Sequence, residues 1–107
     1  MSTKNIMLCC VAGMSTSLLV NKMKKAATEL EKDVVIFATS VSGFDQELAS
    51  RQVDCVMLGP QVSYMEKDFK EKLKDKNIPL SVINMQDYGM MNGEKVLLQA
   101  YELMGGE

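Results

Sequence analysis

Cys10 stands at the end of an apolar segment and precedes a run of small residues that leads into an amphipathic segment. The run consists of Val11, Ala12, Gly13, Met14, Ser15, Thr16 and Ser17. The first N–H groups of a helix have no acceptor within the helix, and the helix dipole adds partial positive charge there. Such a turn stabilises an anion, either a thiolate or a phosphoryl group, and the three hydroxyls offer further hydrogen bonds. The alternative interpretation is that Cys10 is a small buried side chain and Gly13 only eases a tight turn.

The remaining cysteines and the missing histidines narrow the chemistry. Cys9 and Cys55 lie within apolar segments and are interpreted as core residues. The chain contains no histidine, which excludes a Cys–His pair or a Ser–His–Asp triad formed by this chain alone. Three cysteines without a C-x-x-C spacing indicate neither a disulfide framework nor a metal site, and we expect no cofactor. Cys10 is therefore the candidate nucleophile.

Length and charge suggest a single compact domain, residues 1–107. The formal net charge is −2, with acidic and basic residues interspersed, so no nucleic-acid footprint is expected. No apolar stretch approaches the roughly 18 residues that cross a bilayer, and no signal peptide precedes the first apolar segment. We therefore expect a soluble, cytoplasmic protein without membrane insertion.

Strand and helix patterns alternate along the chain. Strands are expected at 5–9, 33–38, 53–58 and 78–83. Helices are expected at 16–30, around Phe44 and Leu48, from Val62 to Leu73, and around Leu97 to Met104. Ser15 or Thr16 is expected to cap the first helix, and 84–89 is expected to be a loop. This alternation predicts an α/β fold, a small doubly wound, four-stranded parallel sheet with helices on both faces.

Ligands of such sheets bind at the carboxyl ends of the strands, near the switch point of the topology. Three loops are expected to meet there, namely 10–17, 59–61 and 84–93. Their candidate pocket-wall residues are Gln61, Tyr64, Asp87 and Tyr88. Three of them have a simpler alternative: Gln61 and Asp87 fit ordinary turns, and Tyr64 can pack on the third helix.

The spacing around Cys10 resembles that of low-molecular-weight tyrosine phosphatases, in which a cysteine is followed by five residues, an arginine, and a serine or threonine. Thr16 stands at the arginine position here, and Ser17 follows it. The one arginine of the chain, Arg51, is distant in sequence. A guanidinium would bind the phosphoryl group through two hydrogen bonds and stabilise the transition state. Its absence favours a phosphoryl carrier, and a cysteine-dependent phosphatase is the alternative.

Three segments together carry a more specific resemblance. They are 10–19, 58–65 and the Asp87-Tyr88-Gly89 loop. They resemble the IIB component of the bacterial sugar phosphotransferase system (PTS), in the lactose/cellobiose (chitobiose) family. The resemblance implies a sheet of the low-molecular-weight phosphatase type, a phosphocysteine at Cys10, and a phosphate cradle formed by Val11 to Ser17.

The resemblance also implies partners and an activity. Cys10 would take a phosphoryl group from a phosphohistidine of the IIA component and pass it to a sugar held by the membrane component IIC. This is a protein-Nπ-phosphohistidine–sugar phosphotransferase activity, and the implied sugar is a β-glucoside or a cellobiose-, chitobiose- or lactose-type disaccharide. Met14, Met90 and Met91 are candidates for an apolar ring that docks these partners, with core filling as the alternative.

Overall fold

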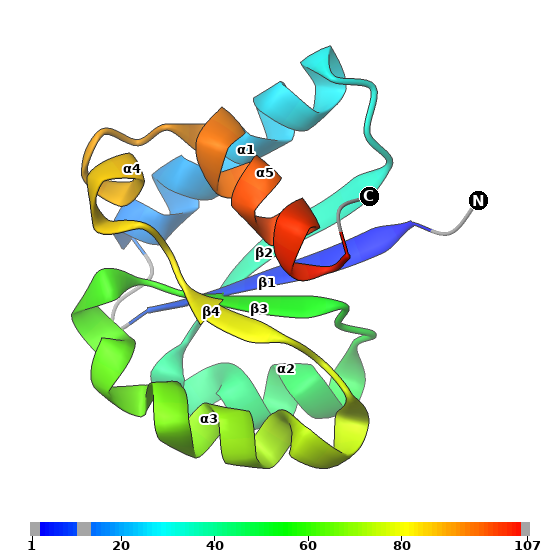
Figure 1. Cartoon of the computed structure of the whole chain (residues 1–107), viewed down its shortest axis with the longest axis vertical. Helices are drawn as coiled ribbons and strands as arrows, with labels where there is room; N and C mark the ends of the chain where they lie inside the picture. The colour runs from blue at the N-terminus through cyan, green and yellow to red at the C-terminus, as the bar shows by residue number, and fades with distance from the viewer. Residues whose placement is uncertain (1–2, 11–13, 106–107) are drawn as a thin grey trace.

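The computed structural model describes residues 3–10 and 14–105, with no side chains described for 14–16. Four strands form one parallel sheet in the order β2-β1-β3-β4. They are β1 (Lys4–Cys10), β2 (Val34–Ser40), β3 (Cys55–Leu58) and β4 (Leu80–Val82). Helices α1 (Met14–Glu29) and α5 (Gly93–Leu103) cover one face, and α2 (Phe44–Ser50) and α3 (Glu66–Leu73) cover the other (Figure 1). The expected α/β fold is confirmed.

Short helices complete the connections. They are η1 (Val41–Gly43), η2 (Pro60–Met65), η3 (Lys74–Lys76) and α4 (Met85–Gly89). In Figure 1, η2 and α4 lie at the same end of the sheet as the carboxyl end of β1 and the start of α1. Three connections are thus gathered at the carboxyl ends of the strands.

The two core clusters follow from the alternation of side chains along β1. Ile6 and Leu8 pack in the cluster that contains residues of α1 and α5. Met7 and Cys9 point the other way, into the cluster of α2 and α3. Both sides of β1 are therefore buried, as expected of a central strand in a parallel sheet.

The structure corrects several sequence-based boundaries. Helix α1 begins at Met14 rather than Thr16, so Ser15 and Thr16 lie inside its first turn and not at its cap. Residues 84–89, expected to be a loop, contain α4, because the side chain of Asn84 accepts a hydrogen bond from the Asp87 N–H at 3.0 Å and caps the helix. Strand β1 extends to Cys10, one residue further than expected.

Candidate functional site

Cys10 is the last residue of β1 and is 3 % exposed. The chain leaves β1 toward α1 on one face of the sheet, whereas it leaves the neighbouring β3 toward η2 and α3 on the other (Figure 1). This divergence makes the carboxyl ends of β1 and β3 the switch point, where ligands of open α/β sheets bind. The fold therefore places Cys10 at the position where a ligand site is expected.

Gly59, directly after β3, lies against Cys10. Its N–H donates a hydrogen bond to the carbonyl oxygen of Cys9 at 2.8 Å. A Cβ added at Gly59 would lie 3.3 Å from Cys10 Cβ and 3.2 Å from Gln61 Oε1. Cys10 and the Gln61 side chain thus approach the same small space from two sides. The structure brings Gln61 close to Cys10, although its role in binding stays a prediction.

A second polar turn borders Cys10 from the other side. Ser40, the last residue of β2, pairs with Cys10 in the sheet register. Its Oγ accepts a hydrogen bond from the Gly43 N–H at 3.2 Å and lies 3.0 Å from Ser42 Oγ. The sequence analysis missed this turn. Its signal was the set of hydroxyl residues immediately after the second expected strand.

The other candidate wall residues lie in different settings. Tyr64 is 72 % exposed on η2. Tyr88 is buried in the core cluster that holds residues of α1 and α5, because α4 turns that side chain inward. Asp87 borders a groove of about 410 Å³ between α4 and α5, which neither Cys10 nor Gln61 lines. The structure therefore groups Gln61 with Cys10, and it places Tyr88 in the core and Asp87 at the α4–α5 groove.

Two of the three thiols are held in their neutral form. Burial, with a smaller contribution from the neighbouring Cys10, raises the pKa of Cys9 to about 12. Burial also raises the pKa of Cys55 to about 12, with a smaller contribution from Asp54. A thiol with so high a pKa is protonated at neutral pH and is a poor nucleophile. Cys9 and Cys55 are core residues, as the sequence analysis expected.

Arg51, which could supply a positive charge to a phosphoryl group, contacts Glu47 and Phe37 instead. Its Nε lies 2.9 Å from Glu47 Oε1, and its guanidinium stacks 4.2 Å from the centroid of the Phe37 ring. Arg51 follows α2 and precedes β3, so it lies toward the amino ends of the strands, away from Cys10. Arg51 therefore does not replace the cation missing at Thr16.

Part of the predicted phosphate cradle lies outside the described residues, namely Val11, Ala12 and Gly13 and the side chains of Met14, Ser15 and Thr16. Ser17, in the first turn of α1, is exposed. Over residues 3–10 and 14–105, no group of three or more Asp, Glu, Cys or His side chains could hold a metal ion. Within the same ranges, no helix is both long and apolar enough to cross a membrane.

A family model described as "PTS system, Lactose/Cellobiose specific IIB subunit" matches residues 5–99. The chain belongs to this IIB family. PTS IIB components are phosphotransferases of sugar transport and act together with IIA and IIC components. The position of Cys10 and the family therefore point to the same class of chemistry, phosphoryl transfer.

Curated relatives and solved structures agree with the IIB assignment. A galactose-specific EIIB component of Lactococcus lactis subsp. cremoris is 51 % identical, over 97 % of this chain and 99 % of the relative. An oligo-beta-mannoside-specific EIIB component of Bacillus subtilis is 39 % identical, over 94 % and 96 %. The solution structure of a cellobiose-specific IIB protein from Borrelia burgdorferi superposes with a TM-score of 0.77 at 39 % identity, covering 96 % of this chain and 93 % of that one.

A more distant structure shows the same fold. The lactose-specific IIB domain from Streptococcus pneumoniae superposes with a TM-score of 0.82 at 17 % identity, covering 95 % of this chain and 98 % of that one. The IIB fold is thus kept where most of the sequence has changed.

Proposed function

We propose that this IIB protein is a cytoplasmic phosphoryl carrier in which Cys10 is the phosphorylated residue. The observation that carries the proposal is the place of Cys10, at the switch point of the sheet and four positions before Met14, where α1 begins. In the first step, the Cys10 thiolate attacks the phosphorus of a IIA phosphohistidine, so that an S–P bond forms and the N–P bond breaks. In the second, a hydroxyl of a sugar held by IIC attacks the phosphorus. An O–P bond forms, the S–P bond breaks, and the hydroxyl proton passes to a base at the sugar site.

The residues from Val11 to Ser17 are proposed to cradle the phosphoryl group. The support is the start of α1 at Met14, which directs the N–H groups and the positive dipole end of a helix toward the loop that follows Cys10. Phosphoryl transfer requires mainly positioning and charge stabilisation, which such a cradle supplies in part. The partners would supply the rest of each transfer site.

The lack of an arginine at the phosphatase position after Cys10 favours storage of the phosphoryl group over its hydrolysis. Thr16 occupies the place of the phosphatase arginine, and Arg51 is paired with Glu47. In comparable sites, loss of one stabilising group costs about 3–4 kcal/mol of transition-state stabilisation. A phosphocysteine here would therefore outlast a phosphatase intermediate.

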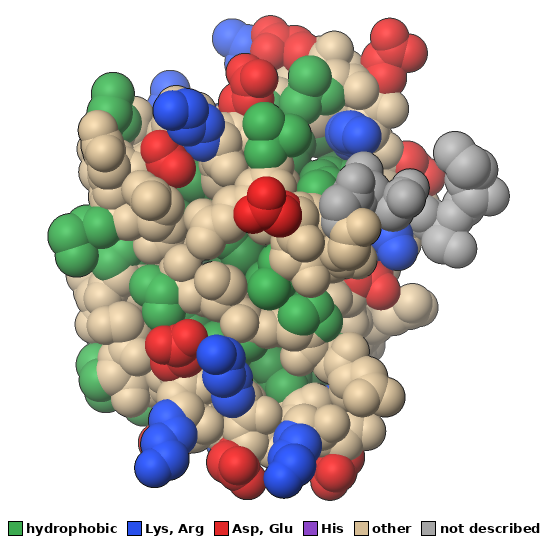
Figure 2. All heavy atoms as spheres, in the orientation of Figure 1, with side chains coloured by type: hydrophobic (Ala, Val, Ile, Leu, Met, Phe, Trp, Pro, Cys, Tyr) green, Lys and Arg blue, Asp and Glu red, His purple; other side chains and the backbone are tan. Residues whose placement is uncertain are grey.

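Apolar side chains are exposed on the elements that surround Cys10. Seven large apolar side chains are exposed among the described residues, and four of them belong to α1, η2 and α4 or directly follow α4. We call this set the carboxyl rim: Leu18, Tyr64, Met85 and Met90. Figure 2 shows hydrophobic side chains along the margin of the molecule where η2 and α4 lie in Figure 1.

Exposed methionine suits surfaces that adapt to more than one partner, and we propose that IIA and IIC dock on the carboxyl rim. The exposure of Met90 supports this role, which stays a prediction. Met91 is partly buried against the core instead, and the side chain of Met14 lies outside the described residues. The sugar is proposed to be a β-glucoside or a cellobiose-, chitobiose- or lactose-type disaccharide. The cellobiose-specific name of the Borrelia burgdorferi protein supports this set, whereas the galactose and oligo-beta-mannoside named for the other two relatives lie outside it.

The experiment is a chase of labelled phosphate. The protein is labelled with phosphoenolpyruvate, the general PTS proteins and a IIA of the lactose/cellobiose type, then separated from them. Alone it should retain the label, and membranes containing the matching IIC with cellobiose should discharge it to the sugar. Rapid release of inorganic phosphate by the protein alone would contradict the carrier function and favour the phosphatase.

A further inference from the structure

Strand β4 forms one edge of the sheet, so its backbone groups on the side away from β3 face no neighbouring strand. Such an edge leaves strong donors and acceptors unpaired and invites pairing with another chain. The Val82 carbonyl and the Asn84 N–H are of this kind, because the intervening Ile83 turns the other way and donates its N–H to the Leu58 carbonyl oxygen of β3 at 2.8 Å.

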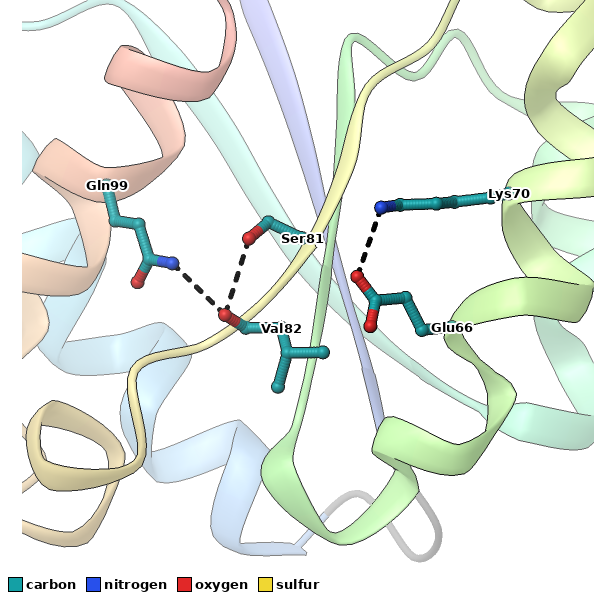
Figure 3. A network of polar contacts seen from close by, with 5 residues as sticks. All are labelled: Glu66, Lys70, Ser81, Val82 and Gln99. Atoms are coloured by element: carbon teal, nitrogen blue, oxygen red, sulfur yellow. Dashed lines mark hydrogen bonds and ion pairs between the residues drawn. The ribbon is translucent and has the colours of Figure 1, made fainter.

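The side chain of Gln99 reaches from α5 to this edge. Its Nε2 donates a hydrogen bond to the Val82 carbonyl oxygen at 3.1 Å (Figure 3), and its Oε1 accepts one from the Asn84 N–H, also at 3.1 Å. Ser81 Oγ adds a longer contact of 3.4 Å to the same carbonyl. In a parallel sheet, one residue of the next strand would pair with such a C=O and N–H. The Gln99 carboxamide therefore occupies the place of one residue of a fifth strand.

Asn84 links this contact to α4. Besides donating its N–H to Gln99, Asn84 accepts the N–H of Asp87 with its side chain and the N–H of Tyr88 with its carbonyl, at 3.0 and 2.9 Å. Helix α4 carries Met85, and Met90 directly follows it, with exposed fractions of 74 % and 69 %. Half of the carboxyl rim thus depends for its position on the strand end that Gln99 holds.

We propose that Gln99 is a positioning residue for partner docking, which fixes α4 so that Met85 and Met90 are already placed when phosphorylated IIA arrives. This inference rests on the proposed carrier function. When an element is ordered before docking, the complex forms without the entropy cost of ordering it. Loosening α4 should therefore lower the affinity for IIA more than the rate of the transfer step. Gln99 lines the groove between α4 and α5, of which Cys10 is no part.

The test replaces Gln99 with methionine, which keeps the length of the side chain and its helix propensity but removes both hydrogen bonds. Gln46→Met is the matched control, because Gln46 is exposed on α2, on the opposite face of the sheet. Phosphoryl acceptance is measured against the concentration of phosphorylated IIA from a lactose/cellobiose-type system. Gln99→Met should raise KM by about three- to tenfold with kcat unchanged, as expected for the loss of one or two hydrogen bonds.

Two further measurements separate positioning from general damage. Amide hydrogen exchange at Asn84 should quicken in Gln99→Met but not in Gln46→Met, while alkylation of Cys10 by iodoacetamide should proceed at the wild-type rate in both. A KM equal to that of the control would overturn the inference. So would a rise in KM accompanied by a fall in kcat and in the rate of Cys10 alkylation. If wild type and control take no phosphoryl group from IIA, the proposed function itself fails, and the inference with it.

Discussion

Cys10 and Gly59 lie side by side at the carboxyl ends of the neighbouring strands β1 and β3. The space between them exists because Gly59 has no side chain. Gly59 has φ −63° and ψ 148°, an extended conformation that any residue adopts. A glycine is therefore not needed there for its backbone. The position is distinguished by its tight surroundings. A Cβ at Gly59 would lie 3.3 Å from Cys10 Cβ and 3.2 Å from Gln61 Oε1.

Gly59→Ala tests whether this space serves the thiol. A methyl group would press on Cys10 and Gln61 without straining the backbone, so we expect phosphoryl acceptance to slow about tenfold. The melting temperature should change little, since contacts of 3.2 and 3.3 Å are relieved when the neighbouring atoms shift slightly. Gly89→Ala, where a Cβ would meet nothing within 4 Å, is the control. Acceptance as fast as in the control would show that the space has no function.

The buried thiols make a separate prediction about pH. Cys9 and Cys55 ionise near pH 9.0 when unperturbed, but burial raises each pKa to about 12 in the folded protein. Above pH 9 the unfolded chain therefore binds fewer protons than the folded one, and stability must fall as pH rises from about 9 toward 12. Urea denaturation at pH 8 to 10.5 should show this decline, and Cys55→Ala should make it shallower. An unchanged slope in the variant would contradict the assigned cause.

At the scale of elements, the contact between α1 and α5 depends on Gly93, the first residue of α5. A Cβ there would lie 2.5 Å from the backbone carbon of Lys22 and 2.7 Å from the N of Met23, distances that side-chain motion cannot relieve. Helix α5 therefore meets α1 backbone to backbone at this point. The contact also fixes the helix that carries Gln99.

Gly93→Ala should destabilise the protein by about 1–3 kcal/mol, because α5 must move away from α1 to admit the methyl group. Denaturant unfolding measures the change, with Gly89→Ala in α4 as the matched control. In the control the same substitution meets open space, so it should be neutral or slightly stabilising. Equal stabilities of the two variants would refute the close packing of the two helices.

Elements with strong local patterns were predictable from the sequence, and pairings between distant segments were not. Buried β1 and amphipathic α1 follow from apolar periodicity. The position of Ser40 beside Cys10 follows from the pairing of β2 with β1, and no local sequence pattern predicts that pairing. The cap of α4 was readable at Asn84, but the short helix was hidden because 84–89 carries several turn-forming residues. The link from Gln99 to β4 spans 17 residues and leaves no local trace.

At the scale of the whole molecule, the strand order β2-β1-β3-β4 turns separate segments into one site. Because all four strands are parallel, the turns after β1, β2 and β3 lie at one end, while the sheet below them is covered on both faces. The site thus lies at the edge of a sheet whose two faces are both packed against helices. Sequence reasoning reached this arrangement for the segments after β1, β3 and β4 and missed the turn after β2.

A sheet with a packed core on each face predicts that phosphorylation leaves the fold unchanged. A preformed amide cradle accepts an anion with little rearrangement, so amide chemical-shift changes should be confined to residues near 10–17, 40–43 and 59–61. Spectra of the free and phosphorylated protein provide the comparison. Shifts spread over α2, α3 and the far end of the sheet would instead indicate a conformational switch.

The central claim is that Cys10 carries the phosphoryl group, and phosphorus NMR of the protein phosphorylated by IIA tests it most directly. Wild type should show a single resonance of a phosphorus bound to sulfur. Cys55→Ser should keep that resonance, whereas Cys10→Ser should fold normally and lose it, since the swap is close to isosteric. A phosphorus signal that persists in Cys10→Ser, or one that maps to Cys9, Cys55 or a hydroxyl oxygen, would contradict the account.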